Sequence, residues 1–132
     1  MSLSKELQIG KAGEHLVCFD LILQGHSAFL ADQGLPYDVL VEHNGKLQKI
    51  QVRSTSKKNN YGKAKNVYRF GTRRGKGTIS RVRKAEVDFY AFVALDIMKI
   101  AYVPIKNMIA KSGTVKQTID LREVHFEKYK KV

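Results

Sequence analysis

Polar residues able to bind a metal ion or a phosphate gather in residues 35–53, which read LPYDVLVEHNGKLQKIQVR. At the centre of this stretch Asn44-Gly45 separates two runs of mixed apolar and polar residues, the strongest short-range signal for a two-residue hairpin turn. Counting outward from the turn places Asp38 opposite Gln51. Directly opposed side chains project from the same face of a sheet. We therefore expect a carboxylate and an amide to meet on one face of a β-hairpin.

Strand alternation extends this polar face beyond the first pair. Arg53 and Lys49 lie two residues to either side of Gln51 and should project with it. The alternate positions should enter a core on the opposite face: Val39, Ile50 and Val52. Asp38 on its own would also suit a loop cap, a common use of aspartate. Its position across from Gln51 favours a chemical role instead.

This pattern resembles the catalytic hairpin of the PD-(D/E)XK nucleases, in which an Asp at the start of one strand and an acidic-x-Lys triplet on the next bind a divalent metal ion. Pro36 and Asp38 match the first part, and Gln51-Val52-Arg53 stands where the triplet is expected. The group I intron-associated endonucleases are the most similar branch, because they use Gln in the triplet, normally as Gln-x-Lys. Arg53 departs from that pattern.

The resemblance covers most of the chain. Gly10-x-x-Gly13-Glu14 precedes the hairpin, and Val87-Asp88-Phe89 leads to Tyr102-Val103-Pro104 after it. It implies an α/β (α+β) fold with a restriction-endonuclease-like core, in which an N-terminal helix is followed by a mixed central β-sheet whose β-hairpin carries the active site. In this family a glutamate on the first helix reaches toward the metal, and Glu14 matches that position. The alternative for Glu14 is a solvated helix residue.

The resemblance implies a Mg²⁺ (or Mn²⁺) site. Such ions prefer oxygen ligands and keep several waters, so one or two carboxylates with the substrate phosphate suffice. We expect Asp38 to be the first ligand and Glu14 the second, with the amide oxygen of Gln51 and the backbone carbonyl of Val52 completing the shell. With fewer negative charges than acidic-x-Lys supplies, the site should bind metal more weakly.

Arg53 occupies the place of the family's lysine. Arginine keeps its proton at any working pH, so it cannot act as a general base, but it can hold the scissile phosphate and stabilise the transition state. Lys49 is a further catalytic candidate that would orient or deprotonate the water, and its alternative is a solvated strand lysine. Either a slow nuclease or a binding protein without turnover fits these substitutions.

The basic residues are concentrated in one block. The formal net charge is +12, and fourteen of the 24 Lys and Arg lie between Glu42 and Glu86, where no acidic residue occurs. A solvated loop or an acidic lipid surface would also suit such a block, but its Gly and Asn content does not suit a membrane-binding amphipathic helix. We expect it to contact the phosphate backbone of a nucleic acid. The candidate residues in the segment 54–85 are Lys57, Lys58, Lys63, Lys65, Arg69, Arg73, Arg74, Lys76, Arg81, Arg83 and Lys84.

The surrounding elements follow from periodicity and from turn residues. Ser4 should cap a helix over 5–24 that ends at Gly25. Its apolar stripe should face the core: Ile9, Ala12, Leu16, Phe19 and Leu23. We expect strands over 26–31, 67–71, 88–94 and 99–103, then a short helix over 105–111 and a packed tail over 119–129. Tyr68 and Phe70 should serve the core, whereas other parts of the basic segment could order only with a partner.

The whole chain, residues 1–132, is expected to form a single domain of this nuclease-like type. No apolar run is long enough to span a bilayer, no secretory signal is evident, and the single Cys18 excludes a disulfide within the chain. A cytoplasmic protein fits these features best. His15, His26, His43 and His125 lack zinc-ligand spacings, and no phosphate-binding loop of the Gly-x-x-x-x-Gly-Lys type occurs.

These observations favour a metal-dependent DNA endonuclease of homing or restriction type that acts on duplex or branched DNA. Cutting both strands with one site per chain implies a homo-oligomer, either a dimer or a tetramer. A Holliday junction resolvase would share the helix glutamate and the hairpin, but normally has acidic-x-Lys, so Gln51 favours the homing type. A non-catalytic nucleic-acid-binding module with the same fold is the alternative outside enzymes.

Overall fold

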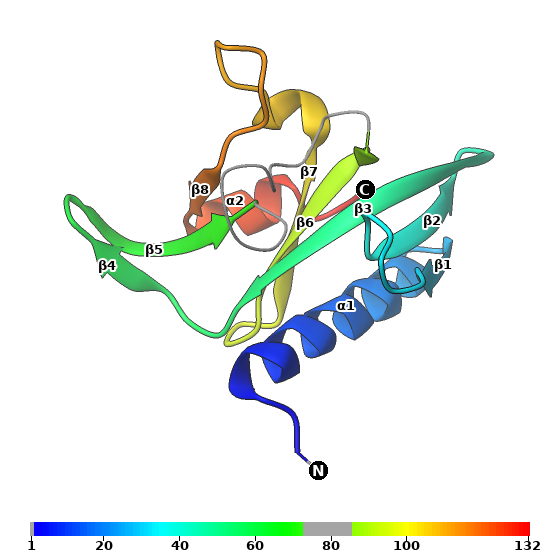
Figure 1. Cartoon of the computed structure of the whole chain (residues 1–132), viewed down its shortest axis with the longest axis horizontal. Helices are drawn as coiled ribbons and strands as arrows, with labels where there is room; N and C mark the ends of the chain where they lie inside the picture. Colours follow the sequence, from blue (N-terminus) through cyan, green and yellow to red (C-terminus); the bar gives the residue numbers. More distant parts are fainter. Residues whose placement is uncertain (1, 73–85) are drawn as a thin grey trace.

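The computed structural model describes residues 2–72 and 86–132 and forms two sheets and a long helix (Figure 1). The first sheet has five strands in the order β1-β2-β3-β6-β7. β3 pairs with β6 in parallel and all other neighbours are antiparallel, so the sheet is mixed, as predicted. Its elements and the helix that precedes them are α1 Lys5–Leu23, β1 Ser27–Leu30, β2 Val39–His43, β3 Lys46–Thr55, β6 Phe89–Ala94 and β7 Lys99–Pro104.

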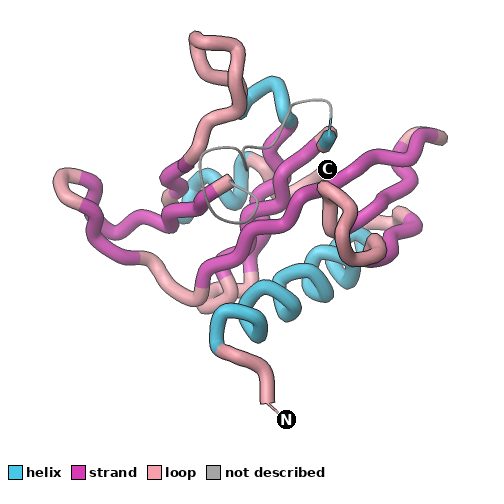
Figure 2. Tube along the Cα trace, viewed as in Figure 1, coloured by secondary structure: helices cyan, strands magenta, loops and turns pink. Residues whose placement is uncertain are grey.

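The second sheet has three strands in the order β4-β5-β8. Figure 2 shows the hairpin of β4 and β5 extending away from the five-stranded sheet. Its elements and the two short helices that follow β7 are β4 Asn59–Tyr61, β5 Ala64–Gly71, β8 Thr118–Leu121, the 3-10 helix η3 Ile105–Met108 and α2 Glu123–Lys128. The strand predicted over 67–71 is therefore the second half of a longer β5.

The predicted hairpin is confirmed in its turn and its register. Asn44 and Gly45 both have positive φ angles, 53° and 77°, as a two-residue turn of this hand requires. His43 lies opposite Lys46, and Val39 lies opposite Ile50. Because β2 begins at Val39, the edge of β3 that faces β2 is unpaired beyond Ile50, whereas β6 pairs along the opposite edge.

Two apolar clusters lie on the two sides of the five-stranded sheet. α1 packs on one side, where Val39, Ile50 and Val52 are buried as predicted. On the other side β5, β8 and α2 cover β6 and β7, and Tyr68 and Phe70 belong to this second core, again as predicted. Among the described residues, no helix is both long and apolar enough to cross a bilayer.

The predicted buried face of α1 is wrong. Phe19 and Leu23 are 60% and 71% exposed, whereas Gly13, Val17 and Leu21 are buried against the sheet. The helix is rotated because a Cβ at Gly13 would lie 1.7 Å from Oγ of Ser54, so only glycine permits this close approach. The caps are as expected: Ser4 accepts a hydrogen bond from the backbone N–H of Leu7, and Gly25 has a φ of 98°.

Several other boundaries differ from the predictions. The helix expected over 105–111 is a single 3-10 turn over Ile105–Met108. The expected strand over 26–31 is limited to Ser27–Leu30. The C-terminal tail, predicted to pack on the domain, contains β8 and α2, and its Leu121 and Phe126 belong to the core. Within the basic segment, the stretch Asn59–Gly71 forms a hairpin of β4 and β5. Residues 73–85 lie outside the described residues.

Candidate active site

The candidate active site lies beside the start of β2, along the edge of β3 that β2 leaves unpaired beyond Ile50. Asp38 stands just before β2, and its Oδ2 accepts two hydrogen bonds of 2.8 Å, one from Nε2 of Gln51 and one from the backbone N–H of Val52. The backbone N–H of Asp38 in turn donates to the carbonyl of Ile50 at 2.8 Å. These bonds fix the carboxylate against β3, where the hairpin register predicted that it would meet Gln51.

Glu14 reaches the same place from α1. Two adjoining cavities of about 270 and 340 Å³ are both lined by Glu14 and Asp38, and the larger one is also lined by Arg53. The smaller lies between α1 and the loop that leads into β2, and the larger follows the free edge of β3 from Val52 to Ser56. The structure thus brings together two carboxylates and a guanidinium from α1, the loop before β2 and β3.

The electrostatics of the pocket reflect this arrangement. Burial, and then the charge of Asp38, raises the pKa of Glu14, while Lys11 and Arg53 oppose the rise. Burial also raises the pKa of Asp38, against the hydrogen bond from Val52, the charge of Arg53 and the hydrogen bond from Gln51. Two carboxylates that are partly desolvated and repel each other favour a bound cation.

Gln51 is oriented by Asp38. Its side chain is 4% exposed, and it presents its amide N–H rather than its oxygen to the carboxylate. Its Oε1 is buried and has no hydrogen-bond partner within the described residues. A cation beside Asp38 would repel the N–H group and attract Oε1, so Gln51 can act as a ligand only after its amide rotates.

The side chain of Arg53 is hydrogen-bonded to the backbone carbonyl of Val52, which was predicted as a metal ligand. Nη1 of Arg53 donates to the carbonyl of Val52 at 3.2 Å, and Nε donates to the carbonyl of Gly71 at 3.1 Å. The Val52 carbonyl, predicted as a metal ligand, is therefore already an acceptor for Arg53. The two carbonyls hold the guanidinium at the wall of the larger cavity.

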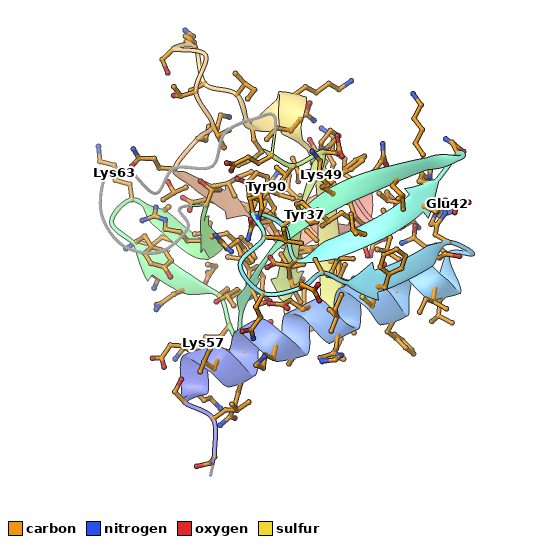
Figure 3. All side chains as sticks on the ribbon, turned by 45° about the vertical axis from the view of Figure 1, so that its right-hand side comes forward. Tyr37, Glu42, Lys49, Lys57, Lys63 and Tyr90 are labelled. Carbon is orange, nitrogen blue, oxygen red and sulfur yellow. The ribbon has the colours of Figure 1, made fainter. Side chains whose placement is uncertain are left out.

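Lys49 lies apart from these groups. It does not line either cavity that Glu14 and Asp38 share, although it is on the same strand face as Gln51. Its backbone N–H donates to Oδ2 of Asp88 at 2.8 Å, and Figure 3 shows its side chain in the part of the molecule near Tyr37 and Tyr90. Its predicted role beside the attacking water stays a prediction.

Glu6 is a pocket residue that the sequence analysis missed. It lines both cavities, together with Gly10 and Glu14. Spacings of four and eight residues place Glu6, Gly10 and Glu14 on one face of a helix, and this was the available signal. In the described part of the chain, no three His, Cys, Asp or Glu side chains form a cluster that could hold a metal. The two carboxylates would therefore need additional oxygen ligands.

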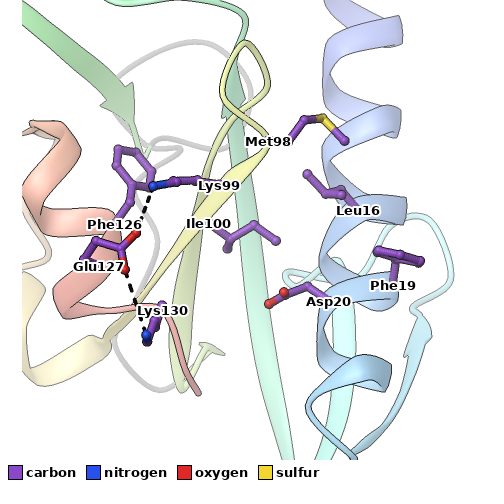
Figure 4. A pocket seen from close by; sticks show the side chains of 9 residues that line it. All are labelled: Leu16, Phe19, Asp20, Met98, Lys99, Ile100, Phe126, Glu127 and Lys130. Atoms are coloured by element: carbon purple, nitrogen blue, oxygen red, sulfur yellow. Dashed lines mark hydrogen bonds and ion pairs between the residues drawn. The ribbon is translucent and has the colours of Figure 1, made fainter.

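A separate cavity of about 260 Å³ lies on the other flank of α1, between this helix, β7 and α2 (Figure 4). Its acidic groups are already engaged. Asp20 accepts hydrogen bonds from Tyr102 and Gln24, and Glu127 pairs with Lys99 at 2.8 Å. This cavity therefore lacks the open carboxylate pair found beside Asp38.

The residues predicted to contact nucleic acid fall into three groups: exposed and without an ion pair, paired with an acidic residue, or outside the described residues. Lys57, Lys63 and Lys65 are exposed and form no ion pair within residues 2–72 and 86–132. Lys58 is 3.4 Å from Glu123, and Arg69 is paired with Asp120. The remaining six lie outside the described residues: Arg73, Arg74, Lys76, Arg81, Arg83 and Lys84.

Comparison with known proteins decides the family. A model of the PD-(D/E)XK endonuclease family matches residues 5–132, nearly the whole chain. The chain belongs to the PD-(D/E)XK endonuclease family. Its structure is similar to that of the bacterial homing endonuclease I-Ssp6803I, with a TM-score of 0.71 and 18% sequence identity over 91% of this chain and 80% of that one. No curated protein matches the chain.

Membership in the PD-(D/E)XK family confirms the resemblance drawn from the hairpin and makes the chain a member of a nuclease family. The structural similarity confirms a restriction-endonuclease-like fold with an N-terminal helix and a mixed sheet. At 18% identity it supports the fold alone, so the roles of individual PD-(D/E)XK pocket residues remain predictions.

Proposed function

We propose that this chain is a metal-dependent endonuclease that hydrolyses phosphodiester bonds of DNA, of the homing or restriction type. The observation that carries the proposal is the meeting of Glu14 and Asp38 in one pocket at the free edge of β3, with Arg53 beside them. The family membership supports nuclease chemistry, and PD-(D/E)XK nucleases in general use divalent ions. The excess of basic residues supports a polyanionic substrate.

The oxygen donors of the pocket fit Mg²⁺ or Mn²⁺. Glu14 and Asp38 are carboxylates, Gln51 has an unpartnered amide oxygen, and no sulfur or imidazole is among the described residues that line the two cavities. Hard divalent cations prefer such ligands. A bound cation would supply a lower pKa for the attacking water and positive charge opposite the phosphoryl oxygens.

The chain's own residues would then position the reacting groups. Asp38, fixed by Gln51 and Val52, offers a rigid ligand, while Glu14 contributes a second oxygen from α1. Arg53 keeps its proton and is held at the cavity wall, so it can bind a phosphate oxygen as negative charge develops on it. No side chain of this set other than the carboxylates can accept a proton, so water activation would depend on them and on the cation.

Cleavage of both strands would require two copies of the chain, because each described chain carries one such pocket. We therefore propose that the active form is a homo-oligomer, a dimer or a tetramer. We also propose that it acts in the cytoplasm, because its single cysteine is free and half-buried, and disulfides are what oxidising compartments favour.

The test is cleavage of supercoiled plasmid and of a four-way junction by the purified protein, each with Mg²⁺, Mn²⁺ or EDTA. Asp38→Asn is the matched variant, because asparagine still offers an oxygen to the N–H of Val52 but removes the charge. We expect plasmid nicking that needs the metal and falls by about a thousandfold in the variant, a typical effect of losing a primary metal ligand.

Other outcomes would identify the alternatives. Preferential cutting of the four-way junction would support a junction resolvase. Salt-sensitive DNA binding with no cutting under any metal would support a non-catalytic module and would overturn the proposed function. Cutting that persists in EDTA would overturn the metal dependence.

A further inference from the structure

The β4–β5 hairpin, residues Asn59–Gly71, has the form of a recognition ribbon. It follows β3 directly and extends away from the five-stranded sheet (Figure 1). Its turn at Gly62-Lys63 is tight, with a φ of 57° at Gly62. A two-stranded ribbon fits the major groove of B-DNA, which is about 12 Å wide.

The base of this hairpin is braced by side chains. Arg69 makes two hydrogen bonds with the carboxylate of Asp120 on β8, of 2.7 and 2.9 Å, and its guanidinium lies 4.2 Å from the centre of the Tyr61 ring. Tyr68 and Phe70 anchor the same strand in the core. The guanidinium of Arg69, predicted as a DNA contact, is therefore used to hold β4 and β8 on either side of β5.

Four exposed residues in β4, in the turn and at the start of β5 present hydrogen-bond donors: Asn59, Asn60, Lys63 and Lys65, together called the tip. Its residues are exposed, and its two lysines carry only donors. The side-chain oxygens of Asn59 and Asn60 already accept the backbone N–H groups of Asn60 and Asn66, at 2.8 and 2.9 Å. What remains for a partner is the amide N–H groups of the asparagines and the ammonium groups of the lysines.

A surface made of donors is complementary to acceptors. In the major groove guanine offers two acceptors, N7 and O6, whereas cytosine offers a donor. The tip also lies close to the proposed site along the chain: Lys63 is ten residues from Arg53, so at about 3.3 Å per residue the two Cα atoms can be at most about 33 Å apart. This distance corresponds to about ten base pairs of DNA at 3.4 Å each.

We propose that the β4–β5 hairpin enters the major groove and reads guanine within about ten base pairs of the scissile phosphate, with Lys63 and Lys65 as the principal base contacts. This inference rests on the proposed function as a DNA endonuclease. It gives two roles to the basic residues of the hairpin: Arg69 supports the hairpin, and the two lysines of the tip contact the bases.

The test is selection of bound duplexes from a random-sequence DNA library by the full chain in EDTA, followed by sequencing. The test variant is K63A together with K65A, which changes only exposed side chains. The control is Lys46→Ala, because Lys46 belongs to the β2–β3 turn at the opposite end of the longest axis (Figure 1). A second arm sequences the ends produced by cleavage with Mg²⁺ and aligns the preferred bases on the cut.

The wild type and Lys46→Ala should enrich guanine in a defined block, and the double variant should lose this preference by about five- to a hundredfold, as expected for one or two base contacts. In the second arm the block should lie within about ten base pairs of the cut. An unchanged preference with only a smaller salt dependence would mean phosphate contacts and would overturn the inference. A wild type that enriches no bases would also overturn it. Failure of cleavage alone would overturn the proposed function but not the ribbon, because selection needs no cutting.

Discussion

The pocket beside Asp38 and the β4–β5 hairpin are held in place by different means. The pocket is positioned by the backbone: Asp38 accepts a hydrogen bond from the main chain of β3, and α1 lies close to β3 because Gly13 has no side chain. Among the described strands, the hairpin pairs with the rest of the molecule only through β8, and the pair of Arg69 and Asp120, with Tyr61 beside it, adds side-chain contacts across β4, β5 and β8. The proposed catalytic groups, whose chemistry tolerates little displacement, thus lie in the closely packed part of the molecule, whereas the proposed DNA-reading residues lie on the exposed β4–β5 hairpin.

The two regions also differ in charge. Four acidic residues line the pocket, against the two basic residues Lys11 and Arg53, whereas the hairpin carries two exposed lysines and no acidic residue; the four are Glu6, Glu14, Asp32 and Asp38. The acidic pocket would repel DNA if it were empty of cations, while the lysines attract it. Binding and catalysis should therefore respond separately to mutation and to metal.

Glu14→Gln should produce the largest effect. The substitution removes one of two proposed ligand carboxylates, and we expect cleavage to fall by about a thousandfold while salt-sensitive DNA binding persists. Plasmid nicking and filter binding on the same preparation measure both. Loss of binding and cleavage in parallel would contradict the separation of the two regions.

The same variant should raise the stability of the metal-free protein. Because the pKa of Glu14 is raised on folding, the native state binds this proton more tightly than the unfolded chain does. The free energy of unfolding therefore decreases as the pH rises above the ordinary pKa of 4.5. Glutamine removes the penalty. The melting temperature at pH 7 should exceed that of the wild type, the difference should vanish near pH 4 (about the lower end of this window), and Mg²⁺ should stabilise the variant less.

Gly13→Ala should reduce cleavage by about a hundredfold and destabilise the protein by about 1–3 kcal/mol, the usual cost of overpacking. The added Cβ would meet Oγ of Ser54 and push α1, with Glu14, away from Asp38. Adding Ser54→Gly to this variant should restore much of both properties, because it removes the atoms that clash. Denaturant unfolding and single-turnover cleavage measure the two effects.

A matched control is Gly10→Ala, since a Cβ at Gly10 meets no atom within 4 Å. It should leave the distance between α1 and β3 unchanged and should stabilise the helix slightly. If Gly10→Ala impairs cleavage as much as Gly13→Ala does, the close approach at Ser54 is not what positions Glu14.

Asp120→Asn should lower base discrimination by about tenfold with little change in stability, because an exposed ion pair contributes only about 0–1 kcal/mol. The Arg69 hydrogen bonds and charge hold the pKa of Asp120 below its ordinary value, so the pair is formed throughout the neutral range. The library selection described above measures the change. If Arg69 instead contacts DNA, its release would increase both affinity and discrimination.

Arg53→Lys should have the smallest effect. It restores the residue usual in the family, and we expect cleavage to be maintained or to rise by about two- to threefold, since the role is mainly positional and electrostatic. Single-turnover cleavage with saturating Mg²⁺ measures it. Elimination of cleavage would mean that the contacts of the guanidinium with the carbonyls of Val52 and Gly71 are essential.

Much of the fold could be predicted because its signals are local. The Asn44-Gly45 turn set the register of β2 and β3, and this register placed Asp38 beside Gln51. The β4–β5 hairpin was missed in its first half, because Asn, Gly and Lys in residues 59–65 have low strand propensity and read as a loop. Its strands form because they pair with each other and with β8.

By itself the sequence determined the turn, the alternation that it starts and the concentration of basic charge, because these depend on neighbours within a few residues. Only the tertiary structure decided which face of α1 is buried, that Glu6 joins the pocket, that the amide of Gln51 turns its N–H toward Asp38, and that Arg69 is paired with Asp120. Each of these depends on contacts between elements far apart in the chain, where close packing and charge pairing are settled only once the sheets and the helix have come together.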